Sequence, residues 1–202
     1  MKKNEILLFI IAVTLSMLAY FILGNPDMNQ SSLTLTSKSF TSGGIIPKKY
    51  TCDGENISPQ LSWSGLKSEN VKNYVLVVDD PDAKQVVGKT FVHWIVLLSP
   101  NTTMLPEGIS GNKTSSLSSI DTAAKELTND FSNNYYGGPC PPSGTHTYRF
   151  TLFALSQPLD ALNGDFFTKA FTADAFRNYM TRNIIAETTI TGTYIHKDSH
   201  ER

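Results

Sequence analysis

The sequence has no excess of charge of either sign. Its 202 residues include 17 Lys and Arg against 18 Asp and Glu, which gives a formal net charge of −1 at pH 7. Proteins that bind nucleic acid usually carry a basic patch or stripe, so we expect no nucleic-acid partner. Hydrophobic residues make up 40% of the chain. This is ordinary for one globular domain with a core, and the length does not require a second domain.

Cysteine is also scarce. The chain contains only Cys52 and Cys140, so it can form at most one internal disulfide. In an exported protein such a bridge would tie together the two loops that carry these residues, and two unpaired thiols are the equal alternative. No cysteine stands directly after the apolar run at residues 6–24, so we expect no lipid-modified N-terminus.

A long hydrophobic run occurs only near the N-terminus, over residues 6–24, and Lys2 and Lys3 precede it. A charged start and an apolar centre are typical of an export signal, but this run approaches the roughly 20 residues that span a bilayer. The segment 1–24 is therefore either a cleaved signal peptide or a membrane anchor, and residues 25–32 form a polar linker. Both alternatives predict export, most simply to a bacterial periplasm.

The rest of the chain is dominated by short segments with alternating or dense β-favouring residues, which are typical of strands. These predicted strands cover residues 33–40, 57–63, 73–79, 91–98, 148–155 and 187–195. Short connections between consecutive strands favour antiparallel pairing. The sequence therefore predicts a mainly β fold, an antiparallel β-sandwich-like single domain over residues 33–197 with a helix in its C-terminal region. Residues 198–202 form a polar tail.

Two helices are expected among these strands. Thr172 is a suitable N-cap for a helix from residue 173 to about residue 185. An apolar stripe with spacings of three and four predicts that this helix packs against the core. The stripe consists of Phe176, Tyr179, Met180 and Ile184. A second, short helix over residues 121–127, with Asp121 as its N-cap, is predicted inside a polar stretch that is otherwise irregular.

Polar side chains in apolar surroundings are the candidate functional residues. A loop rich in Pro and Gly, residues 137–144, leads into a strand that carries His146 and Tyr148 two positions apart, so both should project on the same side. His93 lies inside an apolar strand, where an imidazole without a hydrogen bond would cost about 1–3 kcal/mol. Asp80 ends the preceding strand and is the expected partner. From these residues alone, a structural histidine is the more common interpretation.

Two catalytic alternatives find little support in the sequence. Asp80, His93 and His146 have suitable side chains for a metal site, but their wide separation is no ligand-spacing signature. Cys140 or Ser143 could act as a nucleophile with His146, but separations of six and three residues around rigid prolines disfavour a productive geometry, and no Gly-x-Ser-x-Gly elbow is present. We therefore expect no enzyme activity, no metal and no cofactor.

Three ordered motifs carry a family resemblance. The segment Gly-Pro-Cys-Pro-Pro-Ser-Gly-Thr-His-Thr-Tyr at 138–148 resembles the signature Gly-Pro-x-Pro-Pro-x-Gly-x-His-Arg-Tyr of the phosphatidylethanolamine-binding proteins, also called Raf kinase inhibitor-like proteins. Residues 77–83 and 91–96 are similar to the aspartate motif and the histidine strand of that family. Residues 50–63 and 192–194 are similar to its bacterial branch, and the whole likeness covers about 33–194.

The resemblance implies a β-sandwich that binds a small anion and is not an enzyme. Asp80, His93, His146 and Tyr148 match the Asp, His, His and Tyr of the family's anion pocket. Trp94, Pro141 and Pro142 would supply apolar walls. The expected ligand bears a phosphate or carboxylate, and a phosphoethanolamine headgroup, with one anion and one cation, would offset the charge of Asp80. The alternative is a regulatory protein-interaction module, whose protein partner the sequence does not identify.

Two positions depart from the family pattern. Thr147 stands where most members carry Arg between the His and the Tyr, and Lys84 replaces the last Pro of the aspartate motif. Arg149 faces the same side of its strand as Thr147 and is expected to take over the role of the missing Arg.

Overall fold

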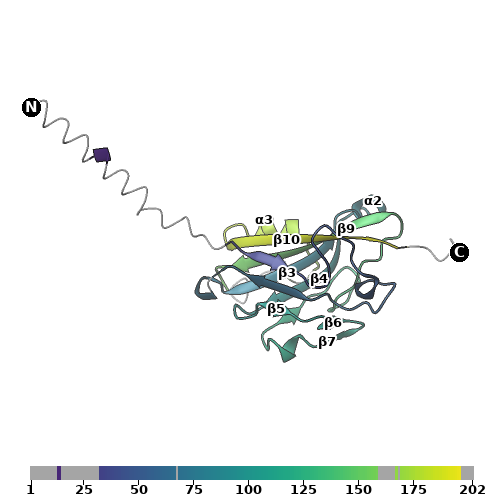
Figure 1. Ribbon diagram of the computed structural model, residues 1–202, viewed down its shortest axis with the longest axis horizontal. Coiled ribbons are helices and arrows are strands. Elements are labelled where there is room, and N and C mark those ends of the chain that lie inside the picture. The colour runs from purple at the N-terminus through teal and green to yellow at the C-terminus, as the bar shows by residue number, and fades with distance from the viewer. Residues whose placement is uncertain (1–12, 15–31, 67, 159–166, 168, 197–202) are drawn as a thin grey trace, which may run out of the picture. The chain divides into compact units, whose positions relative to one another are not determined.

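The computed structural model describes residues 13–14, 32–66, 68–158, 167 and 169–196 (Figure 1). The chain divides into two units, residues 1–31 and 32–202. In the first unit, Val13 and Thr14 are helical and exposed. Among the described residues, no helix has the length and apolar character needed to cross a bilayer. The predicted signal or anchor at 6–24 and the polar tail at 198–202 lie outside these residues, apart from the two helical ones.

The second unit is built from antiparallel strands, as the sequence predicted, and its centre is a sheet of five strands. In spatial order these strands are β10 (Ile184–Ile195), β9 (Thr145–Leu155), β3 (Asn73–Asp80), β4 (Phe91–Leu98) and β8 (Lys125–Glu126). A sheet of three strands contains β1 (Thr34–Thr36), β2 (Leu61–Ser64) and β5 (Met104–Leu105). The small hairpin consists of β6 (Ser110–Gly111) and β7 (Thr114–Ser115).

Both faces of the central sheet are covered by apolar side chains. Along β3, Leu76 and Val78 belong to a core cluster shared with Leu35 of β1 and Leu61 of β2. The alternate residues of β3 belong to a second cluster, which contains Phe176 of helix α3 (Ala173–Tyr179). The three-stranded sheet therefore packs on one face of the central sheet and α3 on the other (Figure 1). This confirms the predicted sandwich-like fold and explains the dense apolar runs of the central strands.

Helix α3 begins where the sequence predicted but ends earlier. The Thr172 side chain caps it by accepting a hydrogen bond from the Ala175 N–H at 3.1 Å. The helix stops at Tyr179 instead of near residue 185, and Ile184 already belongs to β10, where it pairs with Leu155. The apolar spacing in the sequence continued past the end of the helix because Ile184, in the strand that follows, is also partly buried. Pairing with β9 is a long-range interaction, and local spacing does not reveal it.

The predicted helix at 121–127 is wrong. Instead of capping a helix, the Asp121 carboxylate accepts hydrogen bonds from the N–H groups of Ser99 and Ala123 and from the Thr102 hydroxyl. The two residues of β8 then pair with β4 and extend the central sheet. The remaining short helices are α2 (Lys84–Val87) and the 3₁₀ turns η2 (Lys48–Tyr50), η3 (Ser68–Asn70) and η4 (Leu117–Ser119).

Candidate functional site

The end of β3 and the start of β9 bring an acid and an imidazole together. Asp80 is the last residue of β3 and His146 the second of β9, and both side chains are buried. The Nδ1 atom of His146 lies 2.7 Å from the Asp80 Oδ2. A carboxylate can only accept, so Nδ1 carries the proton and donates it. This bond fixes both the tautomer and the orientation of the ring.

A β-bulge sets the direction of His93. Val78 of β3 pairs with Trp94 of β4, but the next residue, Asp79, pairs with Val92, so β4 has one extra residue at this point. Such bulges re-aim side chains and are common beside functional sites. The extra residue is His93, whose ring meets that of Tyr148 with centroids 5.2 Å apart and the planes nearly perpendicular.

The hydrogen-bond partner expected for His93 was wrong. Its Nδ1 lies 2.8 Å from the carbonyl oxygen of Gly137, whereas Asp80 bonds to His146. Burial lowers the pKa of His93, and this outweighs the opposing effects of the Gly137 carbonyl and the Asp80 charge. The ring is therefore held neutral, with its proton on Nδ1 and a lone pair on Nε2.

Tyr148 places an unpaired hydroxyl beside these groups. The residue is 1% exposed, and its hydroxyl makes no hydrogen bond of ordinary geometry with any residue that the structure describes. Burial raises the pKa of Tyr148, and the nearby Asp80 charge raises it further, while the Cys140 main chain acts in the opposite direction. The phenol is therefore a permanent donor. Buried polar groups are nearly always paired in proteins, so an orphan hydroxyl needs a reason.

Hydrogen bonds hold the loop at 137–144 against its surroundings. The Gly137 N–H donates to the His93 carbonyl, and the Gly138 N–H donates to the side chain of Asn56 at 2.7 Å. Gly138 has no room for a side chain, since an added Cβ would lie 2.3 Å from the Tyr50 carbonyl oxygen. Because this loop supplies the Gly137 carbonyl, its fixed position also fixes the His93 ring.

A disulfide ties the same loop to a second one. Cys52 and Cys140 are bonded, with 5.5 Å between their Cα atoms. The Cys52 N–H also donates to the carbonyl of Pro139 at 3.1 Å. Of the two alternatives that the sequence left open, the structure therefore contains the bridge.

Of the four candidate residues, His146 lines a cavity of about 330 Å³, whereas Asp80, His93 and Tyr148 are not among its lining residues. The wall also contains Asp82, Gln85 and Val86 of the segment around helix α2. Ser143, Gly144 and Thr145 complete the lining. A small ligand in this cavity would contact the His146 ring.

Comparisons with known proteins show the family of this chain. The family model described as phosphatidylethanolamine-binding protein matches residues 36–195. The chain belongs to this family. A UPF0098 protein of Methanothermobacter thermautotrophicus is 40% identical over 129 residues, which are 63% of this chain and 80% of that protein. A UPF0098 protein of Archaeoglobus fulgidus is 41% identical over 142 residues, 69% of this chain but 45% of that protein.

Solved structures show the same relationship. A phosphatidylethanolamine-binding protein homologue from Chlamydia trachomatis has a TM-score of 0.65 and 33% sequence identity. The match covers 83% of this chain and 99% of that chain. The family recognised from the sequence motifs, and the fold that it implied, are both confirmed.

Within this member of the phosphatidylethanolamine-binding protein family, the predicted apolar walls lie in different environments. Pro141 is buried and Pro142 exposed, both in the loop beside the cavity. Trp94 is completely buried in the core, where its ring packs against Tyr136 and its indole N–H donates to Glu126. Trp94 therefore supports the sheet from within and does not line the described cavity.

Two aromatic residues near His93 were not predicted from the sequence. The rings of Phe91 and Phe131 each lie 5.3 Å from the His93 ring. Phe91 stands two positions before His93 on the same strand, and this spacing could have identified it as a neighbour of His93. Phe131 comes from the irregular stretch before the loop, where no periodicity marked it. Together they give the imidazole the apolar surroundings that lower its pKa.

The role expected for Arg149 in this family member is corrected by the structure. Its guanidinium donates two hydrogen bonds, at 2.8 and 2.9 Å, to the carboxylate of Asp79, which is completely buried. The Asp79 carboxylate also accepts a hydrogen bond from the Ala173 N–H at the start of α3. Arg149 therefore joins the sheet to α3 and is committed to a structural ion pair. It does not replace an arginine at the rim of the cavity.

Proposed function

We propose that this protein binds a small phosphate-bearing ligand without chemical turnover, and that a phosphoethanolamine headgroup is the ligand class. The observation that carries the proposal is the buried, unpaired hydroxyl of Tyr148 beside the Asp80–His146 pair. A ligand oxygen would give this hydroxyl the acceptor that the described residues do not supply.

The tautomers favour a ligand with both charges. In both imidazoles Nδ1 donates to an oxygen, and Nε2 of the neutral His93 ring can only accept. An ammonium group would be attracted by the Asp80 carboxylate and could donate to this nitrogen, while the phosphate accepts from Tyr148. A bare anion would meet the negative charge of Asp80 with no cationic group of its own to offset it.

The non-enzymatic part of the proposal is supported by the state of the candidate nucleophiles. The sulfur of Cys140 is bonded to Cys52 and offers no thiolate. Ser143 is exposed in the loop. General-base catalysis needs a nucleophile within hydrogen-bond reach of its base, and no such bond links Ser143 to His146 in the described residues.

Export is the proposed location, with residues 6–24 as a cleaved signal or as a tether to the inner membrane. The disulfide supports it, because disulfides persist in oxidising compartments and are rare in the cytosol. Blocking free thiols in separated periplasmic, membrane and cytosolic fractions tests this location. We expect a bridged protein in the periplasmic or membrane fraction, whereas two free thiols in the cytosolic fraction would contradict export.

Calorimetric titration of the full-length protein tests the function. Phosphoethanolamine, inorganic phosphate and ethanolamine should be compared in the wild type, in His146→Ala and in the control His196→Ala. We expect phosphoethanolamine to bind most tightly, with affinity lost in His146→Ala and kept in His196→Ala, which lies outside the cavity. Equal affinity in all three proteins would remove the proposed site.

A further inference from the structure

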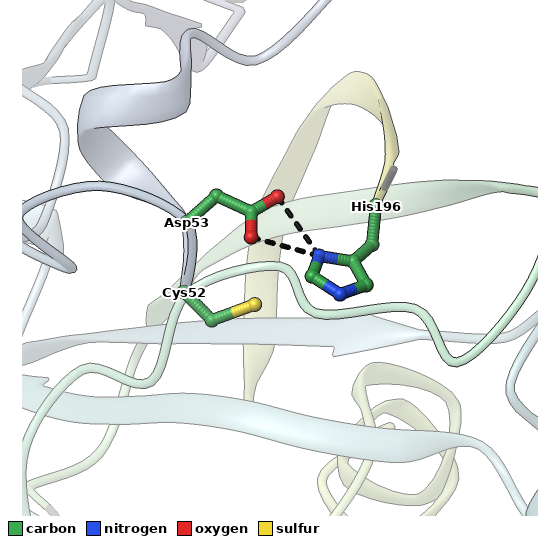
Figure 2. Close-up of side chains that lie close together, drawn as sticks. All are labelled: Cys52, Asp53 and His196. Atoms are coloured by element: carbon green, nitrogen blue, oxygen red, sulfur yellow. Dashed lines mark hydrogen bonds and ion pairs between the residues drawn. The ribbon is translucent and has the colours of Figure 1, made fainter. Parts of the chain in front are cut away.

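A second cluster of metal-ligating side chains consists of Cys52, Asp53 and His196 (Figure 2). Cys52 and Asp53 follow the 3₁₀ turn η2, and His196 follows directly after β10. One ligand atom from each of these three residues lies within 4.8 Å of the others. The cluster therefore joins two chain segments through sulfur, carboxylate and imidazole groups.

The carboxylate of Asp53 is already positioned within this cluster. The Nδ1 atom of His196 lies 2.8 Å from Oδ1 and 2.9 Å from Oδ2 of Asp53. The Tyr194 hydroxyl donates to the same carboxylate. These contacts orient the Asp53 carboxylate, in the way that neighbouring groups commonly orient metal ligands.

The disulfide adds a fourth group. Cys140 is bonded directly to Cys52, so its sulfur lies beside the same cluster. Two thiolates, one imidazole and one carboxylate are the number and kinds of donor that Zn²⁺ prefers in tetrahedral sites, and thiolates select for soft or borderline metals. In the disulfide neither sulfur carries the negative charge that a metal ligand needs.

We propose that the cluster is a redox-gated site for Zn²⁺ or a similar divalent metal. It forms when the Cys52–Cys140 bond is reduced and both sulfurs join Asp53 and His196. A dithiol reductant supplies two electrons and two protons and becomes a disulfide itself, while the bond in the protein becomes two thiols. The metal then displaces the thiol protons into solvent. Metal binding and the disulfide are mutually exclusive states of one pair of sulfurs.

The surroundings allow a cation to reach this site. The side chains of Asp53 and His196 are 21% and 28% exposed, and Cys52 is exposed. Either state of the sulfur pair would hold the Cys140 loop against the Cys52 loop, since a shared metal links the two chain segments as the disulfide does. We therefore expect the metal to restore the stability that reduction removes.

Co²⁺ titration of the reduced full-length protein tests the proposal, because thiolate ligands give Co²⁺ distinct charge-transfer absorption. A phosphine should be the reductant, since it takes its oxygen from water, becomes an oxide and does not leave a competing thiol. We expect one Co²⁺ per chain with thiolate bands, and at least about tenfold weaker binding in Asp53→Asn and His196→Ala. Glu187→Gln is the control, because this exposed carboxylate pairs with Arg177 and is not part of the cluster, and this variant should bind Co²⁺ as the wild type does.

Thermal unfolding separates loss of ligands from loss of fold. Zn²⁺ should raise the Tm of the reduced wild type by mass action and leave that of the oxidised protein unchanged. The Tm of each variant is also measured without metal. Metal-free Asp53→Asn and His196→Ala should unfold near the Tm of the metal-free wild type. Co²⁺ binding without thiolate bands, equal binding by oxidised protein, or unchanged affinity in His196→Ala would each overturn the proposal.

Discussion

The carboxylate of Asp80 and the imidazole of His146 are hydrogen-bonded at 2.7 Å although 66 positions separate them in the chain. Both side chains are nearly buried, with exposures of 4% and 7%. The pair places a negative charge beside the unpaired hydroxyl of Tyr148. Any ligand oxygen that accepts from that hydroxyl therefore approaches a fixed carboxylate, and the second charge of the ligand decides whether the approach is favourable.

Replacement of this carboxylate should change ligand preference. In Asp80→Asn the repulsion of a bare anion is removed, while the side-chain oxygen can still accept from His146. We expect inorganic phosphate to bind several-fold more tightly and phosphoethanolamine to lose its advantage over phosphate. Calorimetric titration of both ligands measures the two affinities in each protein.

The outcome separates a zwitterion site from a simple anion site. Asp82→Asn is the matched control, because Asp82 lines the same cavity but does not bond to either histidine. A variant at Asp80 that weakens both ligands equally would show that the carboxylate only positions His146 and does not select the ligand.

Tyr148→Phe should affect binding and stability in opposite ways. Burial of an unpaired hydroxyl costs about 1–3 kcal/mol, so its removal should leave the free energy of unfolding unchanged or increase it. Phosphoethanolamine affinity should fall about tenfold, which corresponds to about 1.4 kcal/mol. Urea denaturation and calorimetry on the same preparations measure both quantities.

Tyr136 offers the matched comparison for this variant. It is also completely buried, but its hydroxyl donates to the Tyr50 carbonyl at 2.9 Å. Tyr136→Phe should lower the free energy of unfolding by about 1 kcal/mol or more because that carbonyl loses its donor, with little change in affinity. A stability loss of equal size in Tyr148→Phe would mean that its hydroxyl is bonded in the folded protein.

The central strands could be predicted because their own residues specify them. Strand β4 has the predicted bounds, 91–98, and β3 extends only one residue further than expected. The outer elements depend on distant partners. The predicted strand at 33–40 is reduced to Thr34–Thr36, and the two residues of β8 become a strand only because β4 is beside them. Local patterns carry no information about such pairings.

The candidate site shows the same limit. Family motifs located all four polar residues, and alternation along β9 placed two of them on one side. The bond between Asp80 and His146 could not be predicted, because it depends on strand register. The bulge that turns His93 toward Tyr148 is likewise a property of two paired strands and not of either sequence alone.

Acid should destabilise the protein through His93. Burial lowers its pKa below the ordinary value of 6.5, so the unfolded chain binds a proton at a pH where the folded chain does not. Stability therefore falls as the pH drops below about 6.5, by at most about 1.4 kcal/mol per pH unit for this one proton. Urea denaturation from pH 8 to pH 5 should show a shallower dependence in His93→Gln, and equal slopes would place His93 in contact with solvent.

The buried pair of Arg149 and Asp79 should dominate the stability of the opposite face of the sheet. Asp79 is completely buried and the Arg149 side chain is 23% exposed, so Arg149→Met leaves an isolated charge in the interior. We expect a loss of about 3–5 kcal/mol in the free energy of unfolding. Arg177→Met is the matched control, since its pairs with Asp174 and Glu187 are exposed and should contribute less than about 1 kcal/mol. Urea denaturation of both variants measures the difference, and similar losses would show that Asp79 is held mainly by the Ala173 N–H.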